Sequence, residues 1–317
     1  RLQELVCGTE AVHRLCADSG AVTPYRGAVI GDLRDYRLQQ CHRFPLKAAS
    51  QMTSYSALVA GGIHSSTVTE RKPFSSVDAE TTDFAELPSG ASFGSAVHDI
   101  LEEVSFAELL RPRQHRAVLH DTCNAYGLQA DMTLLESMLQ TVVSAPIGRC
   151  VEARFTLADI NEKRCIKEMG FYFHLAGGET GNLNAILAGE ESVCPIAERE
   201  LAGFLTGFVD LIFEHEGVYY IADYKTNNLG PYLGDYHGTS LVEAMAQHNY
   251  GLQLWLYALV LHRHLANFLP GYDHGRHFGG VFYLFVRGMG KWPAGIYYRK
   301  PEFDTLERLG RCFGGKN

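Results

Sequence analysis

Two stretches in the first half of the chain carry apolar residues at helical spacing. The first predicts a helix that begins near Gly94, because apolar side chains recur at i, i+3, i+4 and i+7. Its apolar face consists of Val97, Ile100, Leu101 and Val104. The second predicts a helix over about residues 130–145, with a face formed by Met132, Leu135, Met138, Leu139 and Val142. Residues 62–92 are rich in Ser, Thr, Gly and Pro, which predicts an irregular segment before the first helix.

From about residue 168 onward the apolar pattern is typical of strands. Residues 171–175 predict one strand, and 205–213 and 218–224 predict two more, joined by a tight turn as a hairpin. Residues 241–268 predict one long helix, buried because its middle is apolar on nearly every face. Residues 279–286 predict a last apolar strand. This order of helix, three strands, long helix and strand favours an α/β fold with helices on the faces of a mixed sheet.

The two ends of the chain differ in character. Residues 1–45 have mixed polarity and no sustained period, so we interpret them as a connecting segment from a preceding region and residues 46–317 as one domain. The chain begins at Arg1 rather than Met, which suggests a fragment. No run approaches about 18 apolar residues, so we expect no membrane span. Without a signal peptide, a cytoplasmic location is expected.

Cysteine usage argues against a metal cluster held by thiolates. The eight cysteines are scattered, and none form a C-x-x-C pair. Structural zinc sites and iron–sulfur clusters are commonly held by closely spaced thiolates, so such a site is poorly supported. We therefore expect free, reduced thiols, as in a cytosolic protein.

Net charge at first argues against nucleic-acid binding. The chain carries a formal charge of −8, whereas nucleic-acid-binding domains are typically basic. Residues 201–300, however, hold seven Lys/Arg and seven Asp/Glu, so the acidic excess lies elsewhere. The part of the chain with the candidate chemistry is neutral, and a nucleic-acid substrate is not excluded.

The predicted hairpin carries two aspartates in apolar surroundings. If Glu216 and Gly217 form a two-residue turn, Asp210 faces Asp223 across the hairpin; a bulge at Gly217 would shift this pairing by one residue. Opposed side chains lie with their Cβ atoms about 4.5–5.5 Å apart, where like charges are destabilising. Desolvation among apolar neighbours increases that repulsion. A divalent cation between the two carboxylates would relieve it.

Lys225 follows Asp223 by two residues, so its side chain projects to the same face of the strand. Two carboxylates and one ammonium on a sheet face suit metal-assisted phosphodiester hydrolysis. The metal activates water, and the lysine stabilises the charge of the phosphorane or positions the nucleophile. The alternative is a structural Asp223–Lys225 ion pair on a half-exposed strand, with Asp210 in a turn. The residues alone leave both interpretations open.

Several segments together resemble a known nuclease family. Gly207-Phe-Val-Asp210 followed by Asp223-Tyr-Lys225 resembles the core of the PD-(D/E)xK nuclease superfamily, and Gln253-x-x-x-Tyr257 resembles the extra motif of its RecB-type branch. Residues 50–310 are similar to the RecB-type nucleases of bacterial exonuclease V, most densely from 165 to 290. The resemblance implies an α/β fold with a restriction-endonuclease-like PD-(D/E)xK core, in which helices flank a mixed central β-sheet.

The resemblance also implies which residues hold the metal. It implies that His98, Asp210 and Asp223 bind Mg²⁺ together with the backbone carbonyl of Tyr224, and that Lys225 is the catalytic lysine. Histidine is an unusual ligand for Mg²⁺, which prefers oxygen. Only the match of the segment around His98 to the family assigns it this role.

Three further residues match family positions. Glu168 matches a strand glutamate that can orient the attacking water, and its alternative role is that of a surface carboxylate at a strand edge. The chain has Gly170 where a second acidic residue would fit the pattern. Gln253 and Tyr257 lie on one helix face. They either contact DNA phosphate or support the catalytic strand, or Tyr257 is simply a packed core residue.

The function implied by the resemblance is that of a Mg²⁺-dependent DNA nuclease of the exodeoxyribonuclease V type, acting in double-strand-break repair and recombination. The implied partners are single-stranded DNA fed from unwound duplex, RecC-like and RecD-like subunits and a recombinase, with no membrane. The alternative is a catalytically inactive nuclease fold used as a DNA-binding or scaffold module. The presence of Asp210, Asp223 and Lys225 argues against that alternative.

Overall fold

A computed structural model of the chain describes residues 52–54, 58, 80–111, 115–198 and 200–313. The predicted connecting segment, residues 1–45, lies outside the described residues. So do residues 62–79 of the predicted irregular segment. Within the described residues, no helix is long and apolar enough to cross a membrane.

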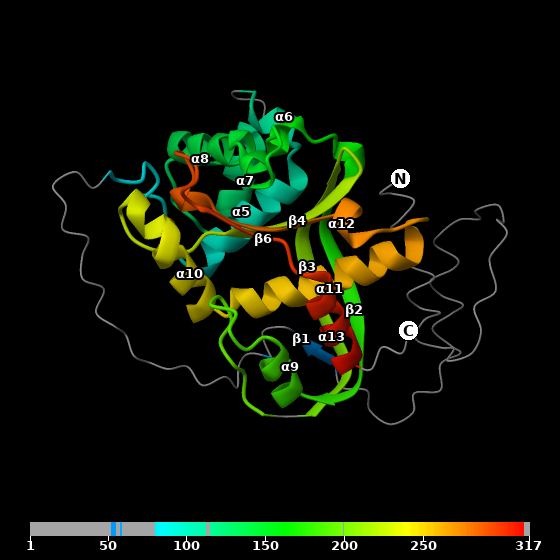
Figure 1. The fold of residues 1–317 in the computed structure, drawn as a ribbon. Helices are drawn as coiled ribbons and strands as arrows, with labels where there is room; N and C mark the ends of the chain where they lie inside the picture. Colours follow the sequence, from blue (N-terminus) through cyan, green and yellow to red (C-terminus); the bar gives the residue numbers. More distant parts are fainter. Residues whose placement is uncertain (1–51, 55–57, 59–79, 112–114, 199, 314–317) are drawn as a thin grey trace, which may run out of the picture.

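A six-stranded mixed sheet forms the centre of the molecule (Figure 1). Its strands are β1 (Met52–Ser54), β2 (Cys165–Glu179), β3 (Glu200–His215), β4 (Val218–Lys225), β5 (Phe278–Phe285) and β6 (Ile296–Arg299). Strand β3 runs antiparallel to β2 and β4 and parallel to β1. Strand β4 pairs in parallel with β5, which pairs antiparallel with β6. The predicted mixed sheet is confirmed.

The described helices surround this sheet. They are α5 (Ala91–Glu103), α6 (Phe106–Leu109), α7 (Arg116–Ala125), α8 (Met132–Ser144), α9 (Thr180–Ile186), α10 (Gly238–Gln247), α11 (Tyr250–Phe268), α12 (His274–His277) and α13 (Phe303–Cys312). Short 3-10 turns join several of them. The predicted helices near Gly94 and over 130–145 are confirmed as α5 and α8. The side chain of Asp131 caps the start of α8 by accepting from the amide of Thr133.

The sheet separates two apolar cores. On one face it packs against α11 and α13, and on the other against α5 to α8, as Figure 1 shows. The alternation along β4 follows this division. Tyr219 and Ile221 lie in the first core, and Tyr220 and Ala222 lie in the second. Both faces of β4 are thus buried, so the polar residues Asp223 and Lys225 stand out in this strand.

The prediction of one long helix over 241–268 is wrong, because two helices occupy this range. Helix α10 ends at Gln247 and α11 begins at Tyr250. Asn249 between them has a positive φ of 53°, a conformation that asparagine tolerates better than most residues. Its side-chain amide accepts from the amide of Cys194 and donates to the carbonyl of the same residue. This tertiary pairing fixes the break, which the apolar pattern does not show.

The long strand β3 has different neighbours along its two edges. Strand β2 pairs with β3 from Phe213 to Glu200, nearly the whole length. The other edge is shared: β4 pairs with residues 211–215 and β1 with residues 204–206. Among the described residues, no strand pairs with residues 207–210 on that edge. The candidate site lies at this interval.

Candidate active site

The β3–β4 hairpin has the predicted register. Glu216 and Gly217 form its two-residue turn with positive φ values of 52° and 84°, as a type I′ turn requires. Leu211 pairs with Ala222, and the following pairs continue without a bulge to the turn. The ladder ends at this pair, however. Asp210 and Asp223, which occupy the next position, are not paired.

Helix α5 and strands β2 and β3 bring three potential ligands together. His98 Nδ1 lies 3.4 Å from Asp210 Oδ2 and 4.0 Å from Glu168 Oε1. One ligand atom from each of the three residues lies within 4.8 Å of the others. Among the described residues, this is the one such group of three or more. All three residues are partly exposed, so the cluster is accessible from solvent.

An irregularity in both strands turns Glu168 and Asp210 toward α5. Val209 packs in the core with α11, whereas Leu211 packs in the core with α5, although residues two apart in a regular strand share a face. The same reversal occurs in β2, where Glu168 has a positive φ of 48°. Such backbone is costly for a residue other than glycine and is concentrated at functional sites. The strain therefore supports Glu168 as a functional residue.

Asp223 and Lys225 form a second group beside this cluster. Asp223 is almost fully buried, and its Oδ1 contacts the Nζ of Lys225. The two groups are linked through the backbone, because Asp210 Oδ2 accepts a hydrogen bond of 2.7 Å from the amide of Tyr224. Asp223 is thus in direct contact with Lys225. For Tyr224, the contact with the cluster is made by its amide, and its carbonyl has no contact there that the structure records.

The charged side chains of the two groups shift one another's pKa values. Burial alone would lower the pKa of His98, but the carboxylates of Asp210 and Glu168 outweigh it and raise that pKa to about 10. Burial, and after it the charge of Asp210, raises the pKa of Asp223 to about 6. Burial would also raise the pKa of Asp210, but His98 and Lys225 hold it below its ordinary value. Without a metal, protonated His98 therefore supplies the positive charge that these carboxylates require.

The two residues of the extra motif connect the lysine to β3. Gln253 Oε1 accepts from Lys225 Nζ at 3.3 Å, and Gln253 Nε2 donates to the hydroxyl of Tyr257 at 2.7 Å. That hydroxyl donates to the carbonyl of Phe208 at 2.7 Å, on the edge that no described strand covers. Tyr283 also donates to Gln253 Oε1, at 3.0 Å. The motif thus supports both the lysine and the strand that carries Asp210.

Sequence reasoning did not assign the two aromatic side chains beside Lys225 to the site. Its ammonium lies 4.3 Å from the ring centroid of Tyr250 and 5.2 Å from that of Tyr283. The hydroxyl of Tyr250 donates to Asn227, whose amide contacts His248. Tyr250 stands one helical turn before Gln253, and this spacing was the available signal. Tyr283 sits in a uniformly apolar strand, where nothing in the sequence marks it.

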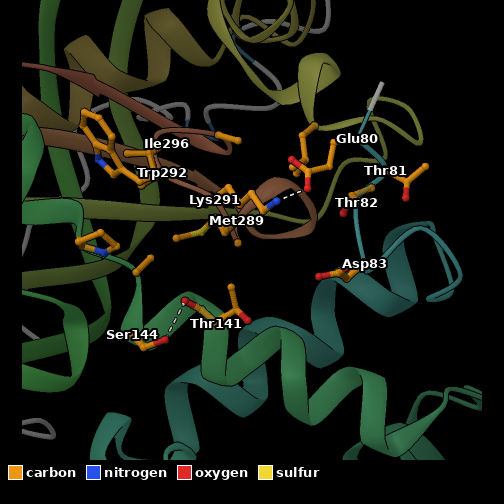
Figure 2. Close-up of a pocket in the computed structure, with 15 residues that line it drawn as sticks. Glu80, Thr81, Thr82, Asp83, Thr141, Ser144, Met289, Lys291, Trp292 and Ile296 are labelled. Atoms are coloured by element: carbon orange, nitrogen blue, oxygen red, sulfur yellow. Dashed lines mark hydrogen bonds and ion pairs between the residues drawn. The ribbon is translucent and has the colours of Figure 1, made fainter. Parts of the chain in front are cut away.

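A separate cavity of about 430 Å³ lies between α8 and the loop before β6 (Figure 2). Thr141 and Ser144 of α8 line one side, and Lys291 and Trp292 line the other. Lys291 is paired with Glu80 across the cavity mouth. None of the candidate catalytic residues lines this cavity. Its charged lining residues are Glu80, Asp83 and Lys291, and they are not part of the group of potential metal ligands found among the described residues, so we place the candidate chemistry at the His98 cluster.

Known proteins match the same part of the chain. A sequence model described as the PD-(D/E)XK nuclease superfamily matches residues 77–311. The chain is similar to proteins named RecBCD enzyme subunit RecB: 35% identical over 239 residues in Haemophilus influenzae and 33% over 237 residues in Escherichia coli. These matches cover 72% and 73% of this chain, but 19% and 20% of the relatives. The relative in Mycolicibacterium smegmatis is 34% identical over 266 residues, covering 72% of this chain and 24% of its own length.

Proposed function

The chain belongs to the PD-(D/E)XK nuclease superfamily and is a RecB-like nuclease domain. We propose that it hydrolyses DNA phosphodiester bonds as an exodeoxyribonuclease V-type enzyme with Mg²⁺ as cofactor. One observation carries this proposal. The His98–Glu168–Asp210 cluster and the Asp223–Lys225 pair adjoin each other at the interval between β1 and β4. Potential ligands for a metal ion thus lie beside the ammonium group of the proposed catalytic lysine.

The donor set fits a divalent cation. Glu168 and Asp210 offer carboxylate oxygens, the ligands that Mg²⁺ prefers, and His98 adds an imidazole nitrogen. Asp223 and the carbonyl of Tyr224 complete the proposed set. A cation bound there supplies positive charge and Lewis acidity beside the scissile phosphate.

The side chains of the chain itself then perform separate tasks. In hydrolysis the oxygen of water attacks phosphorus, the bond from phosphorus to the leaving oxygen breaks, and negative charge grows on the phosphoryl oxygens. We assign to Lys225 the donation of hydrogen bonds to those oxygens. Glu168 accepts a hydrogen bond from the attacking water and orients it. Gln253 and Tyr257 hold Lys225 and β3 in their relative positions.

The relatives suggest the setting of this activity. They are named as RecB subunits of the RecBCD enzyme, and the chain spans about a fifth of their length. We infer that RecC-like and RecD-like subunits are its partners and that its substrate is single-stranded DNA from an unwound duplex. Its place would be DNA repair and recombination in the cytoplasm, with a recombinase as a further partner.

The proposal is tested by cleavage of an end-labelled single-stranded oligonucleotide by this chain. Cleavage is expected in Mg²⁺ and should stop with a chelator. It should not occur in Ca²⁺ alone, which accepts a looser shell than Mg²⁺. His98→Ala should abolish cleavage, whereas His120→Ala, a change on the exposed face of α7, should leave it intact. DNA binding without cleavage in any divalent cation would instead favour the inactive scaffold.

A further inference from the structure

The exposed face of the β2–β3 ribbon carries an unusual row of aromatic side chains. Phe208 and Tyr172 are 62% and 59% exposed, the highest values among the large apolar side chains of the described residues. The row continues with Phe204 and His174, whose ring centroids lie 5.1 Å apart. We call these four residues the aromatic stripe. An exposed apolar patch of this kind indicates a binding surface.

The register of the two strands orders the stripe. Gly170 pairs with Phe208, Tyr172 with Thr206, and His174 with Phe204. Each of these three rows therefore contributes at least one ring to the same face, and successive rows are about 6.6–6.8 Å apart.

The opposite face of the ribbon is core. Phe171, Phe173, Leu205 and Val209 are buried against the side that holds α11 and α13. The stripe therefore lies on the face that α5 covers farther along the strands, and within the described residues Tyr172, His174 and Phe208 remain exposed there.

The stripe runs directly into the candidate active site. Glu168 and Asp210 stand two residues beyond Gly170 and Phe208 along their strands, and both side chains lie close to His98. The hydrogen bond from Tyr257 to the carbonyl of Phe208 ties this end of the stripe to the network that holds Lys225. The rings thus share the β2–β3 ribbon with Glu168 and Asp210.

Gly170 gives the stripe its shape. A Cβ atom at this position would lie 3.3 Å from the ring of Phe208, closer than a comfortable contact. The glycine lets the ring of Phe208 lie across β2. An acidic side chain at position 170 would occupy the space of this ring. With glycine at position 170, an aromatic ring lies next to the cluster where an acidic residue would place a carboxylate.

We propose that the aromatic stripe is a stacking platform for the unpaired bases of single-stranded DNA next to the scissile phosphate. Aromatic rings stack on the faces of bases of any sequence. In a duplex those faces are already covered by neighbouring base pairs, so a duplex cannot use the stripe. The four residues of the stripe add no formal charge, which suits a chain with a net charge of −8. The far end of the ribbon is acidic, with Glu179 paired to Glu200, which limits the platform to the rows beside the site.

This inference rests on the proposed function, because it names the surface that would hold the bases of the substrate of the same site. The test uses the whole chain in Ca²⁺, which is expected to occupy the site without turnover. Fluorescence anisotropy measures binding of a labelled single-stranded oligonucleotide and of the same oligonucleotide with abasic positions. Tyr172→Leu and Phe208→Leu remove one ring each and keep an apolar side chain. Phe303→Leu is the matched control, since Phe303 on α13 is 48% exposed and lies outside the stripe.

Each leucine variant should bind the base-bearing strand about tenfold more weakly than the parent, because one stacked base is lost. The loss should be similar at low and high salt, since no phosphate contact changes. Parent and variants should bind the abasic strand equally weakly, and Phe303→Leu should bind like the parent. Tyr172→Trp keeps an aromatic ring and should bind the base-bearing strand like the parent. Circular dichroism confirms that each variant is folded.

Two results would overturn the platform. One is parent-like binding of the base-bearing strand by both leucine variants, and the other is an equal loss for abasic or duplex DNA. Either result, together with cleavage in Mg²⁺ by the parent chain, refutes the platform and leaves the nuclease proposal standing. A parent that neither cleaves nor binds DNA refutes the nuclease proposal itself.

Discussion

The ammonium of Lys225 is fixed from several directions. Asp223 contacts it, Gln253 accepts from it at 3.3 Å, and the rings of Tyr250 and Tyr283 lie 4.3 and 5.2 Å away. Burial would lower the pKa of Lys225, but Asp223 and Asp210 raise it above its usual value. The side chain is therefore a fixed, permanent cation. Such a group stabilises developing charge without reorganising during the reaction.

Replacement of Lys225 should distinguish an effect on cleavage from an effect on metal binding. Lys225→Met keeps the length of the side chain and should reduce cleavage by roughly a hundred- to a thousandfold. It should also lower the stability of the metal-free protein by about 3 kcal/mol, because buried Asp223 loses its partner. Calorimetry should show Mn²⁺ binding at least as tight as in the parent, since a nearby positive charge is gone. Lys300→Met, a change remote from the site, serves as the control. Near-normal cleavage by Lys225→Met would refute the assigned role.

The hydroxyl of Tyr257 can be tested without disturbing its ring. Tyr257→Phe removes the link between Gln253 and the carbonyl of Phe208. We expect a loss of about 1 kcal/mol in stability and a fall in kcat on the order of tenfold, because Lys225 and β3 lose their common support. Tyr272→Phe, which removes a similar hydrogen bond to His262 away from the site, should leave kcat unchanged. Equal kcat values for the two variants would show that the link has no positioning role.

At the scale of elements, local chemistry was readable from the sequence and tertiary interactions were not. The hairpin register followed from the Glu216-Gly217 turn and the alternation of the flanking strands. Helices α5 and α8 followed from apolar spacing. Strand β1 is only three residues long, and it pairs with β3, which lies far away in the sequence. No local sequence pattern therefore predicts this strand.

The candidate site was only partly predictable for the same reason. Asp210, Asp223 and Lys225 could be named because they stand out in an apolar hairpin. The other site residues, His98, Glu168, Gln253 and Tyr257, could be named only from the resemblance to a known family. Their mutual placement could not be predicted. The reversal of β3 between Val209 and Leu211 turns Asp210 toward α5, whereas Asp223 contacts Lys225. Extending the hairpin pairing beyond the turn assumes that side chains alternate regularly between the two faces, so it cannot predict such a reversal.

The break between α10 and α11 can be tested with two substitutions at Asn249. Both Asn249→Ala and Asn249→Gly remove the paired hydrogen bonds to Cys194, but only alanine is strained at a φ of 53°. Asn249→Ala should therefore be less stable than Asn249→Gly by about 1 kcal/mol. Chemical denaturation measures both values. If the alanine variant equalled or exceeded the asparagine parent in stability, a continuous helix would be an acceptable state of this segment.

At the scale of the whole molecule, the cluster joins the two layers of the fold. His98 comes from the helical layer and Asp210 and Glu168 from the sheet. A bound cation should therefore stabilise the entire fold, as any ligand selective for the native state does. At a hundredfold excess over Kd the gain is about 2.7 kcal/mol. Millimolar Mg²⁺ should accordingly raise Tm by several degrees.

Asp210→Asn gives this effect a control. The variant should lose most of the Mg²⁺-dependent gain in Tm, because a charged ligand is removed. Its metal-free form should also be less stable than the parent, because protonated His98 loses its carboxylate partner. Asp121→Asn, on the exposed surface of α7, should behave like the parent. A metal-free Asp210→Asn protein more stable than the parent would show that repulsion from Asp223 outweighs the attraction of His98.

The union of helical layer and sheet at His98 also has a kinetic consequence. The β3–β4 hairpin joins neighbouring segments, so it can form early, whereas His98 lies roughly a hundred residues upstream and must find it by a long-range search. We therefore expect the cation site to be complete only after the rate-limiting step of folding. Interactions absent from the transition state slow unfolding and leave the folding rate nearly unchanged. In stopped-flow experiments Mg²⁺ should therefore lengthen the lifetime of the native state without accelerating its formation.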